Sequence, residues 1–327
     1  MAELHITRLL ATADLYPSME LVDAEYREVE LVDAGRLGQP DRPIPVAIRW
    51  SPSAPQPMPV VVLSHGGAFG HVNPRGALAE WAEMLTRHGY LSIAIAHTPR
   101  TDLERIVLTM NLGGTLPQCR EFKHLNYDRP LDFMRVVGAL AERQGDPWSG
   151  LIDLSSVAYL GHSSGSGSAM MIAGAGREYM PGLGLAFAEH PRPKAFVALS
   201  PEGAGDDGFQ PNSWDTVQRP VLMCTGAQDG DAPHERRDPY EYMQPGDKYL
   251  LWIEHEGAQH TVFEGDTRAC LAATHDQSIC DDMQAWLGSG IRAFLDAYVR
   301  DDAAAMDYLA TDSLVQASAG VVEWDTK

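Results

Sequence analysis

Cysteine and long hydrophobic runs are both scarce in this sequence, and each deficit excludes a class of protein. The 327 residues contain four cysteines and no C-x-x-C pair, which is too few for a disulfide-rich scaffold. No run of 18 apolar residues occurs, so no membrane span is predicted. The N-terminus also lacks the basic segment and apolar stretch of a signal peptide. We therefore expect a cytoplasmic protein; the alternative is a secreted protein whose signal has been removed.

Positive charge is also in short supply. Lys and Arg number 25 against 45 Asp and Glu, which gives a formal net charge of -20, and no block of five or six like charges forms a tail. Nucleic acids and anionic membranes would be repelled by such a surface, so neither is an expected partner.

The cysteines leave one structural alternative open. They are Cys119, Cys224, Cys270 and Cys280. The last two would form a disulfide if the protein is exported, and would remain free thiols if it stays in a reducing compartment.

Strand-like and helix-like segments alternate from about residue 25 to the C-terminus. Strands are expected at residues 27–32, 44–50, 59–65, 90–97, 156–160, 194–200, 220–226 and 248–255. Helices are expected after Asn73-Pro74, at residues 130–143, and near the C-terminus around residues 283–298. After an N-terminal extension over residues 1–24, the sequence therefore predicts a single α/β domain over residues 25–327, with a mostly parallel sheet flanked by helices on both faces.

Three long connections interrupt this alternation, at residues 98–128, 202–219 and 261–280. Each one follows the C-terminal end of an expected strand. Those ends share one rim of a parallel sheet, where ligands bind, so we expect these insertions to form a pocket and its cover. The alternative is that they are neutral surface insertions.

The pentapeptide GHSSG at residues 161–165 lies between an expected strand and a helix of small residues. It fits G-x-S-x-G with Ser163 in the centre, where glycines two residues away let strand and helix approach closely. Ser163 is therefore the predicted nucleophile, and Ser164 contributes only its backbone N–H. The alternative is an ordinary turn serine.

A serine nucleophile needs a base, and that base needs an orienting acid. Asp229 follows the expected strand at residues 220–226, and His260 follows the strand at residues 248–255. They are the predicted acid and base. Asp231 and Glu202 are the alternative acids, and His255 is expected to be structural.

The segment LSHGGAFG at residues 63–70 contains glycines that allow a backbone N–H to point into the site. Gly67 is predicted to form the oxyanion hole together with the Ser164 N–H, and Ala68 is the second candidate. His65 and His97 are expected to be hydrogen-bonded wall residues. Four apolar residues are candidates for an acyl pocket, with core or surface roles as the alternative: Phe69, Met110, Leu112 and Phe263.

Two competing motifs fail on physical grounds. Residues 203–208 match G-x-G-x-x-G, but two aspartates would face a phosphate and Pro211 spoils a following helix, so a loop is expected. His255 and His260 are five residues apart rather than four and would diverge on a helix, which argues against shared zinc ligation. We expect neither a cofactor nor a metal.

The sequence resembles serine hydrolases of the α/β-hydrolase superfamily over roughly residues 25–310, and within it bacterial predicted dienelactone hydrolases and platelet-activating-factor acetylhydrolase-like esterases. That neighbourhood also contains cutinase-like polyester hydrolases. The matching segments are VVVLSHGGAFG, HGYLSIAIAHT, GHSSGSG, PVLMCTGAQD, EGAQHTVF and IRAFLDAYV. The resemblance implies the α/β-hydrolase fold, with Ser163 as nucleophile, Asp229 as acid, His260 as base and Gly67 as oxyanion donor.

Two departures limit what this resemblance implies. True dienelactone hydrolases use a cysteine nucleophile where this chain has a serine, and residues 266–282 form an insertion after the expected catalytic histidine. We therefore expect a cofactor-free carboxylic ester hydrolase that forms an acyl-enzyme, acting on a small-molecule or polymeric ester. The alternatives are a polyester or phospholipid-type acyl hydrolase with the same triad, and a non-catalytic ligand-binding homologue.

Overall fold

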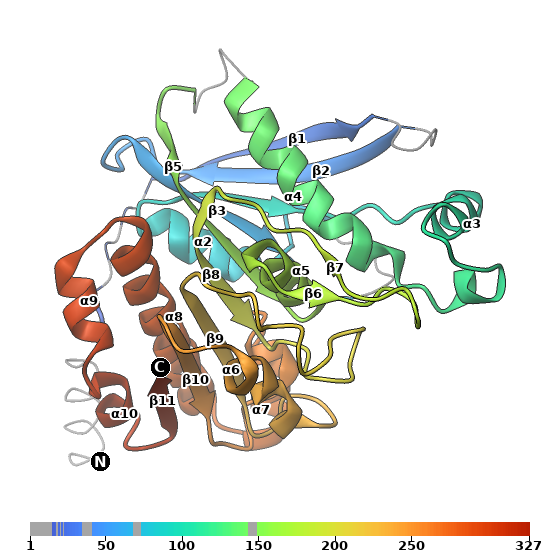
Figure 1. The fold of residues 1–327 in the computed structure, drawn as a ribbon. Coiled ribbons are helices and arrows are strands. Elements are labelled where there is room, and N and C mark those ends of the chain that lie inside the picture. The colour runs from blue at the N-terminus through green and yellow to red at the C-terminus, as the bar shows by residue number, and fades with distance from the viewer. Residues whose placement is uncertain are drawn as a thin grey trace.

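A central β-sheet with helices on both faces organises the molecule (Figure 1). The computed structural model describes residues 15–17, 19, 21, 23–34, 41–67, 73–142 and 149–327. Within these residues the sheet has nine strands, in the order β1 (Glu25–Asp33), β2 (Arg42–Trp50), β4 (Leu91–Ile95), β3 (Met58–Ser64), β5 (Ile152–His162), β8 (Pro193–Leu199), β9 (Val221–Gly226), β10 (Lys248–Ile253) and β11 (Val322–Thr326).

The sheet is parallel in its middle and antiparallel at its edges. The six strands from β4 to β10 in this order pair in parallel, whereas β1, β2 and β11 run antiparallel to their neighbours. The predicted α/β class and the mostly parallel sheet are thereby confirmed. A separate two-stranded ribbon joins β6 (Gly176–Arg177) to β7 (Ala186–Phe187).

The helices of the described residues fill the connections between strands. They are α2 (Ala79–Arg87), α3 (Asp102–Asn111), α4 (His124–Glu142), α5 (Ser164–Ala173), α6 (Asp238–Tyr242), α7 (Arg268–Thr274), α8 (Gln277–Val299), α9 (Ala303–Leu309) and α10 (Ser313–Ala317). Short 3-10 turns are η2 (Pro117–Arg120), η3 (Pro233–Arg237) and η4 (His260–Val262).

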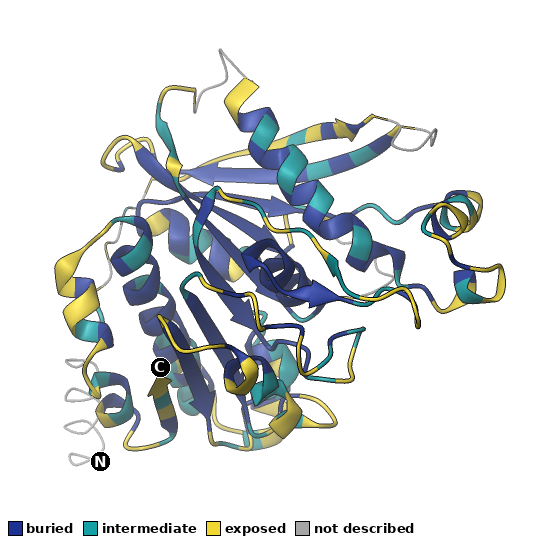
Figure 2. Ribbon diagram, in the orientation of Figure 1, coloured by how far each residue is buried: buried dark blue, intermediate teal, exposed yellow. Residues whose placement is uncertain are grey.

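Two hydrophobic layers, one on each face of the sheet, hold these helices. Alternate residues of β3 point to opposite faces, so Val61 and Leu63 join one layer while Val60 and Val62 join the other. Helices α2 and α8 cover the first layer, and α4 and α5 cover the second. The central parallel strands are accordingly largely buried on both faces, whereas the edge strands β1 and β11 are partly exposed (Figure 2), as expected for parallel strands with near-continuous apolar sequences.

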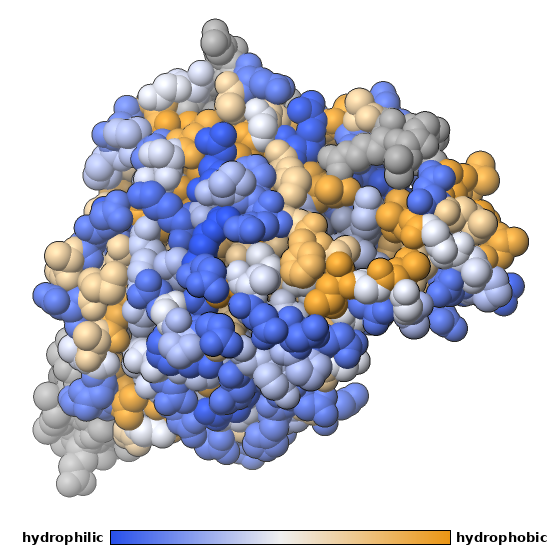
Figure 3. All heavy atoms as spheres, viewed as in Figure 1, coloured by the Kyte–Doolittle hydropathy of each residue, from blue (hydrophilic) through white to orange (hydrophobic). Residues whose placement is uncertain are grey.

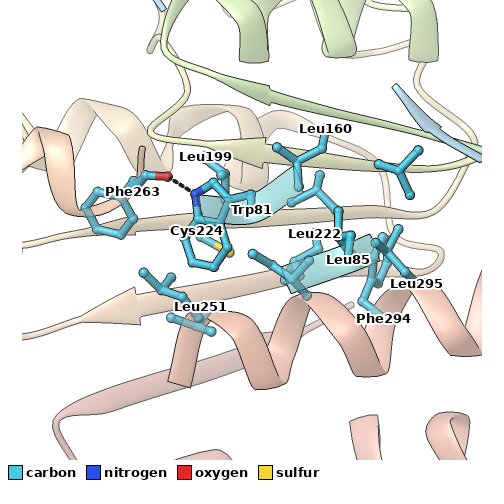
Figure 4. Packing of buried hydrophobic residues seen from close by; sticks show 14 of the residues in the cluster. Trp81, Leu85, Leu160, Leu199, Leu222, Cys224, Leu251, Phe263, Phe294 and Leu295 are labelled. Carbon is cyan, nitrogen blue, oxygen red and sulfur yellow. Dashed lines mark hydrogen bonds between the residues drawn. The ribbon is translucent and has the colours of Figure 1, made fainter. Parts of the chain in front are cut away.

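The packing of the first layer is seen from close by in Figure 4. Trp81 of α2 lies by Phe263 and Cys224, and Leu85 of α2 lies on the same side as Phe294 and Leu295 of α8; Trp81, Leu85 and Phe294 are nearly or fully buried. The indole N–H of Trp81 donates a 2.9 Å hydrogen bond to the carbonyl of Phe263. This bond ties α2 to the segment that follows η4.

Two predicted helix starts are wrong, for local and tertiary reasons. The helix expected after Asn73-Pro74 begins at Ala79, because turns precede it and Leu78 adopts a positive φ of 49°. Helix α4 begins at His124, six residues before Pro130, which lies inside the helix. Proline costs an internal hydrogen bond, but Arg100 holds Asp128 in the preceding turn through a buried ion pair.

The predicted insertions contain regular structure that the sequence patterns did not reveal. Residues 98–128 carry α3, whose start is fixed by a capping box between Thr101 and Glu104. Residues 261–280 carry η4 and α7, and Cys270 is joined to Cys280 by a disulfide. Of the two alternatives left open for this cysteine pair, the structure has the disulfide. Residues 202–219 form turns without helix or strand.

Helix α3 presents apolar side chains to solvent. The exposed large apolar residues of this region are Leu103, Ile106, Met110 and Leu116, and apolar atoms gather over α3 at the right edge of the molecule (Figure 3). In the part of the chain that the structure describes, no helix has the length and apolar content that a membrane crossing requires.

Candidate active site

The proposed nucleophile lies at the turn between β5 and α5. Ser163 has φ 52° and ψ -124°, a backbone conformation that residues other than glycine rarely adopt. Its N–H donates to the carbonyl of Leu199 at the end of β8, and its carbonyl accepts from the Ser166 hydroxyl. This strained turn leaves the side chain half-buried at the carboxyl rim of the sheet.

The two glycines of the pentapeptide are required by close backbone contacts. A Cβ on Gly161 would lie 2.1 Å from the carbonyl oxygen of Gly165, and a Cβ on Gly165 would lie 2.0 Å from that of Ser64. No side chain fits at either place. The predicted reason for this glycine spacing is therefore confirmed: strand β5, helix α5 and strand β3 approach one another too closely for a Cβ.

Asp229 and His260 are brought into direct contact from neighbouring loops. Asp229 follows β9 and His260 opens η4 after β10, and the parallel bridge between Gln228 and Gln259 holds the two loops side by side. The His260 Nδ1 lies 2.7 Å from the Asp229 Oδ1. Of the three acids considered, Asp229 is thus the one hydrogen-bonded to His260, and Asp231 is exposed to solvent.

The carboxylate of Asp229 is buried among donors. Burial raises its pKa, but the hydrogen bond with His260 and the charge of Arg236 outweigh it, so the pKa of Asp229 lies below its usual value. The Thr225 hydroxyl donates to Oδ2 at 2.7 Å, and the Ser200 hydroxyl donates to Oδ1 at 2.6 Å. The carboxylate is therefore held ionised and fixed in orientation.

Ser200 is a site residue that the sequence analysis missed. Its Oγ lies 2.6 Å from Asp229 Oδ1 and 2.7 Å from His260 Nδ1, and it adopts a positive φ of 52°. The hydroxyl thus contacts both the predicted acid and the predicted base. The only signal in the sequence is a serine at a strand end, which many ordinary turns share.

His162, the residue before Ser163, contacts His260 and so connects the two predicted catalytic residues. The His162 Nε2 lies 3.1 Å from the carbonyl of His260, and the two rings are 4.7 Å apart. Among the described residues, His260 forms hydrogen bonds through Nδ1 and its carbonyl, and its Nε2 forms none. The predicted hydrogen bond between Ser163 and His260 is thus not formed in this structure.

The loop after β3 lies beside Ser163. A Cβ on Gly66 would be 2.9 Å from the Ser163 Cβ, and Gly67 adopts a positive φ of 85°. The N-terminus of α5, with the N–H of Ser164, begins directly after Ser163. Two further candidates of this loop, Ala68 and Phe69, lie outside the described residues.

The two histidines expected to be wall residues, His65 and His97, both have hydrogen-bond partners. His97 is fully buried, and burial together with the charges of Arg129 and Arg42 holds its pKa well below the usual value. Its Nε2 lies 2.8 Å from the Ser64 hydroxyl, and the His65 Nδ1 lies 2.6 Å from the carbonyl of Gly66. Both therefore have hydrogen-bond partners, as expected.

His255 also has a structural partner, but not in the expected element. It lies beyond β10 rather than inside it, and its Nδ1 accepts from the Gly257 N–H. It therefore shapes the turn that leads to His260.

Of the expected acyl-pocket residues, the structure places Phe263 in the core. Its side chain is fully buried in the first hydrophobic layer, so the alternative core role holds for it. Met110 lies on α3 with about half of its surface exposed. A cavity of about 760 Å³ opens next to Phe263, between α2 and the segment that follows η4, and is lined by Trp81, Met84, Glu264, Arg268 and Arg292 among others.

Glu202, the alternative acid, is buried apart from His260. Its Oε2 lies 3.4 Å from the Ser166 hydroxyl. Burial raises the pKa of Glu202 to about 7, with Arg177 lowering it and the carboxylates of Asp207 and Asp206 raising it. The folded protein therefore keeps a proton on this carboxyl at pH values where the unfolded chain has lost it.

This raised pKa predicts a pH-dependent stability. Because the folded state binds more protons between about pH 4.5 and pH 7, the contribution of Glu202 to stability falls as the pH rises through that window. Glu202→Gln should remove this loss. Its free energy of unfolding at pH 8 should exceed that of the parent by on the order of 3 kcal/mol, with little difference at pH 4. Urea denaturation at both pH values measures the two free energies. Equal shifts at the two pH values would contradict the prediction.

Among the described residues there is no group of three or more His, Cys, Asp and Glu side chains that could hold a metal ion.

Comparisons with known proteins do not assign the site to a family. No protein-family model matches the chain, and a search of curated proteins finds no match.

Proposed function

We propose that the protein is a carboxylic ester hydrolase with an α/β-hydrolase fold and a serine nucleophile. The observation that carries the proposal is the contact between Asp229 and His260. The ring of His162, the residue before Ser163, lies 4.7 Å from the ring of His260, and Ser163 itself adopts a positive φ. A positive φ also occurs at Ser200, and a buried carboxylate also meets the Nδ1 of His97. The proposal therefore rests on the combination of the two features with the G-x-S-x-G turn, at the ends of neighbouring strands.

In the proposed acylation step, His260 Nε2 takes the proton from the Ser163 hydroxyl as its Oγ attacks the acyl carbon. The resulting oxyanion accepts hydrogen bonds from the N–H groups of Gly67 and Ser164. The carbon to alkoxy-oxygen bond then breaks, and the alcohol leaves with the proton from His260. The product is an acyl ester on Ser163.

Deacylation repeats the chemistry with water. His260 takes a proton from water, the hydroxide attacks the acyl carbon, and Ser163 leaves with that proton as the acid is released. Asp229 keeps the imidazole in the tautomer with hydrogen on Nδ1 and stabilises the imidazolium. Each residue returns to its starting state, so no cofactor is consumed.

A second candidate is an acyl hydrolase for polymeric or lipid-like esters. The exposed apolar side chains of α3 favour it, because Leu103 is 71% exposed and Met110 49% exposed on a segment that follows β4 at the same rim. Apolar surface of this kind favours adsorption to an insoluble substrate. A non-catalytic ligand-binding protein is the remaining alternative.

The test is covalent labelling with a fluorophosphonate probe together with hydrolysis of p-nitrophenyl esters. We expect one probe per chain on the peptide that contains Ser163, and hydrolysis of p-nitrophenyl butyrate that the probe inhibits in proportion. Absence of both would support the non-catalytic alternative. A panel of acyl chain lengths and an insoluble polyester then separate small-ester from polymer hydrolysis.

The disulfide between Cys270 and Cys280 indicates the kind of compartment in which the proposed enzyme acts. Disulfides persist in oxidising compartments and are rare in the cytoplasm, and Cys270 and Cys280 are both buried and bonded. The exported location is therefore the one that we propose.

A further inference from the structure

Arg129 of α4 is a fully buried cation whose partners belong to the loop after β3. Its Nη1 donates to the carbonyl of His65, and its Nη2 donates to the carbonyl of Gly67. Longer contacts reach the Ser64 hydroxyl at 3.3 Å and the carbonyl of Gly66 at 3.4 Å. One guanidinium therefore contacts three successive carbonyls of the loop that lies against Ser163.

These contacts fix how the loop presents its N–H groups. In a trans peptide the carbonyl and the following N–H point in opposite directions. The carbonyl of the peptide between Gly66 and Gly67 lies 2.6 Å from the His65 Nδ1 and 3.4 Å from the Arg129 Nη2, so the N–H of Gly67 points away from both. Gly66 of the same loop lies against Ser163. Arg129 thus fixes the flanking carbonyls of His65 and Gly67 and, together with the His65 ring, favours this orientation of the Gly67 N–H.

The direct partners of the Arg129 charge are the carbonyls of this loop, and the carboxylates of Glu202 and Asp132 act on it without forming an ion pair. In the described part of the chain no carboxylate forms an ion pair with Arg129, whereas Asp132, one turn later, pairs with Arg42 and His97. Burial lowers the pKa of Arg129 to about 10, which leaves it charged at neutral pH. A buried cation at the carbonyl end of peptide dipoles polarises them and strengthens their N–H groups as donors to an anion.

The network behind Arg129 holds it in place. The Ser64 hydroxyl lies between His97 and Arg129, and His97 contacts Asp132 at 2.8 Å. Helix α4 supplies both Arg129 and Asp132, so the loop is bonded to this helix at two points. Such a buried charge is costly unless it is well bonded, which makes a purely space-filling role a poor explanation.

We propose that Arg129 is the positioning residue of the oxyanion hole, holding the carbonyls of His65, Gly66 and Gly67 so that the Gly67 N–H faces the tetrahedral intermediate. This inference rests on the proposed ester hydrolysis. Arg129 touches no reacting atom and acts through the loop alone. Because an oxyanion exists only in the transition state and intermediate, its loss should lower kcat and leave KM nearly unchanged.

The experiment compares Arg129→Met and Arg129→Lys with Arg300→Met. Arg300 also donates to a backbone carbonyl, that of His88, but lies at the end of α8. We expect Arg129→Met to lower kcat about 100-fold, the effect of losing one oxyanion donor. Arg129→Lys should recover part of the loss, since lysine keeps the charge but lacks the fork that reaches several carbonyls. KM should stay within about threefold.

Rates are expressed per fluorophosphonate-labelled site, so that unfolded molecules do not count. If Arg129→Met does not fold, Arg129→Lys carries the same comparison with the parent. A kcat within twofold of the parent in either folded Arg129 variant, or an equal loss in Arg300→Met, overturns the inference.

Hydrogen exchange of the loop separates this inference from the proposed function. Residues 60–67 should exchange at least about tenfold faster in the Arg129 variants than in Arg300→Met, whether or not the parent hydrolyses esters. An inactive parent with this acceleration would refute the ester hydrolysis and retain the positioning of the loop. Unchanged exchange in an active parent series would refute the positioning instead.

Discussion

Ser163→Ala should abolish ester hydrolysis, with kcat falling on the order of 10⁵-fold, because the triad acts as a unit and no other group can form the acyl-enzyme. Initial rates with p-nitrophenyl butyrate measure the effect, and the variant should also fail to label with fluorophosphonate. Ser155→Ala is the matched control, since Ser155 is an exposed serine near the start of the same strand β5. Retention of a tenth of the parent rate would refute the nucleophile assignment.

The backbone at Ser163 adds a second readout. Alanine at φ 52° keeps the strain of the turn, whereas glycine adopts such angles freely. Ser163→Gly should therefore be more stable than Ser163→Ala by about 1 kcal/mol, although both variants are inactive. Denaturant midpoints of the two variants test this, and a less stable glycine variant would show that the turn is not strained.

The elements that the sequence predicts well are those whose signal is local. The apolar runs of β3, β9 and β10 identify buried strands because parallel strands are covered on both faces. The glycine spacing around Ser163 is equally local, since two Cβ atoms would overlap backbone atoms. The positions of Asp229 and His260 after adjacent strands then place them at one rim.

The elements that sequence patterns missed depend on tertiary contacts. Helix α4 extends before Pro130 because buried ion pairs hold its first turns, and β11 exists because β10 offers it an edge to pair with. Nothing in the sequence separates Ser200 from other strand-end serines or Arg129 from other helical arginines. Their roles become visible only when distant segments bring partners to their polar atoms.

Asp229→Asn should lower kcat on the order of 10⁴-fold while leaving the fold intact. An asparagine amide N–H facing His260 Nδ1 favours the tautomer with hydrogen on Nε2, which cannot take the serine proton. The stability of the two proteins should also respond differently to acid. Because the pKa of Asp229 is lowered on folding, its ionisation stabilises the parent at neutral pH, and this contribution is lost as the pH falls below about 4.

The comparison with Glu202→Gln decides between the two acids. If Asp229 orients His260, the asparagine variant loses its rate while Glu202→Gln keeps most of it, since Glu202 contacts Ser166 rather than the imidazole. The opposite pattern would move the acid to Glu202. Ser200→Ala should fall between them, with a loss of about tenfold, because it removes one of the hydrogen bonds that the carboxylate accepts and keeps the charge that supports the imidazolium.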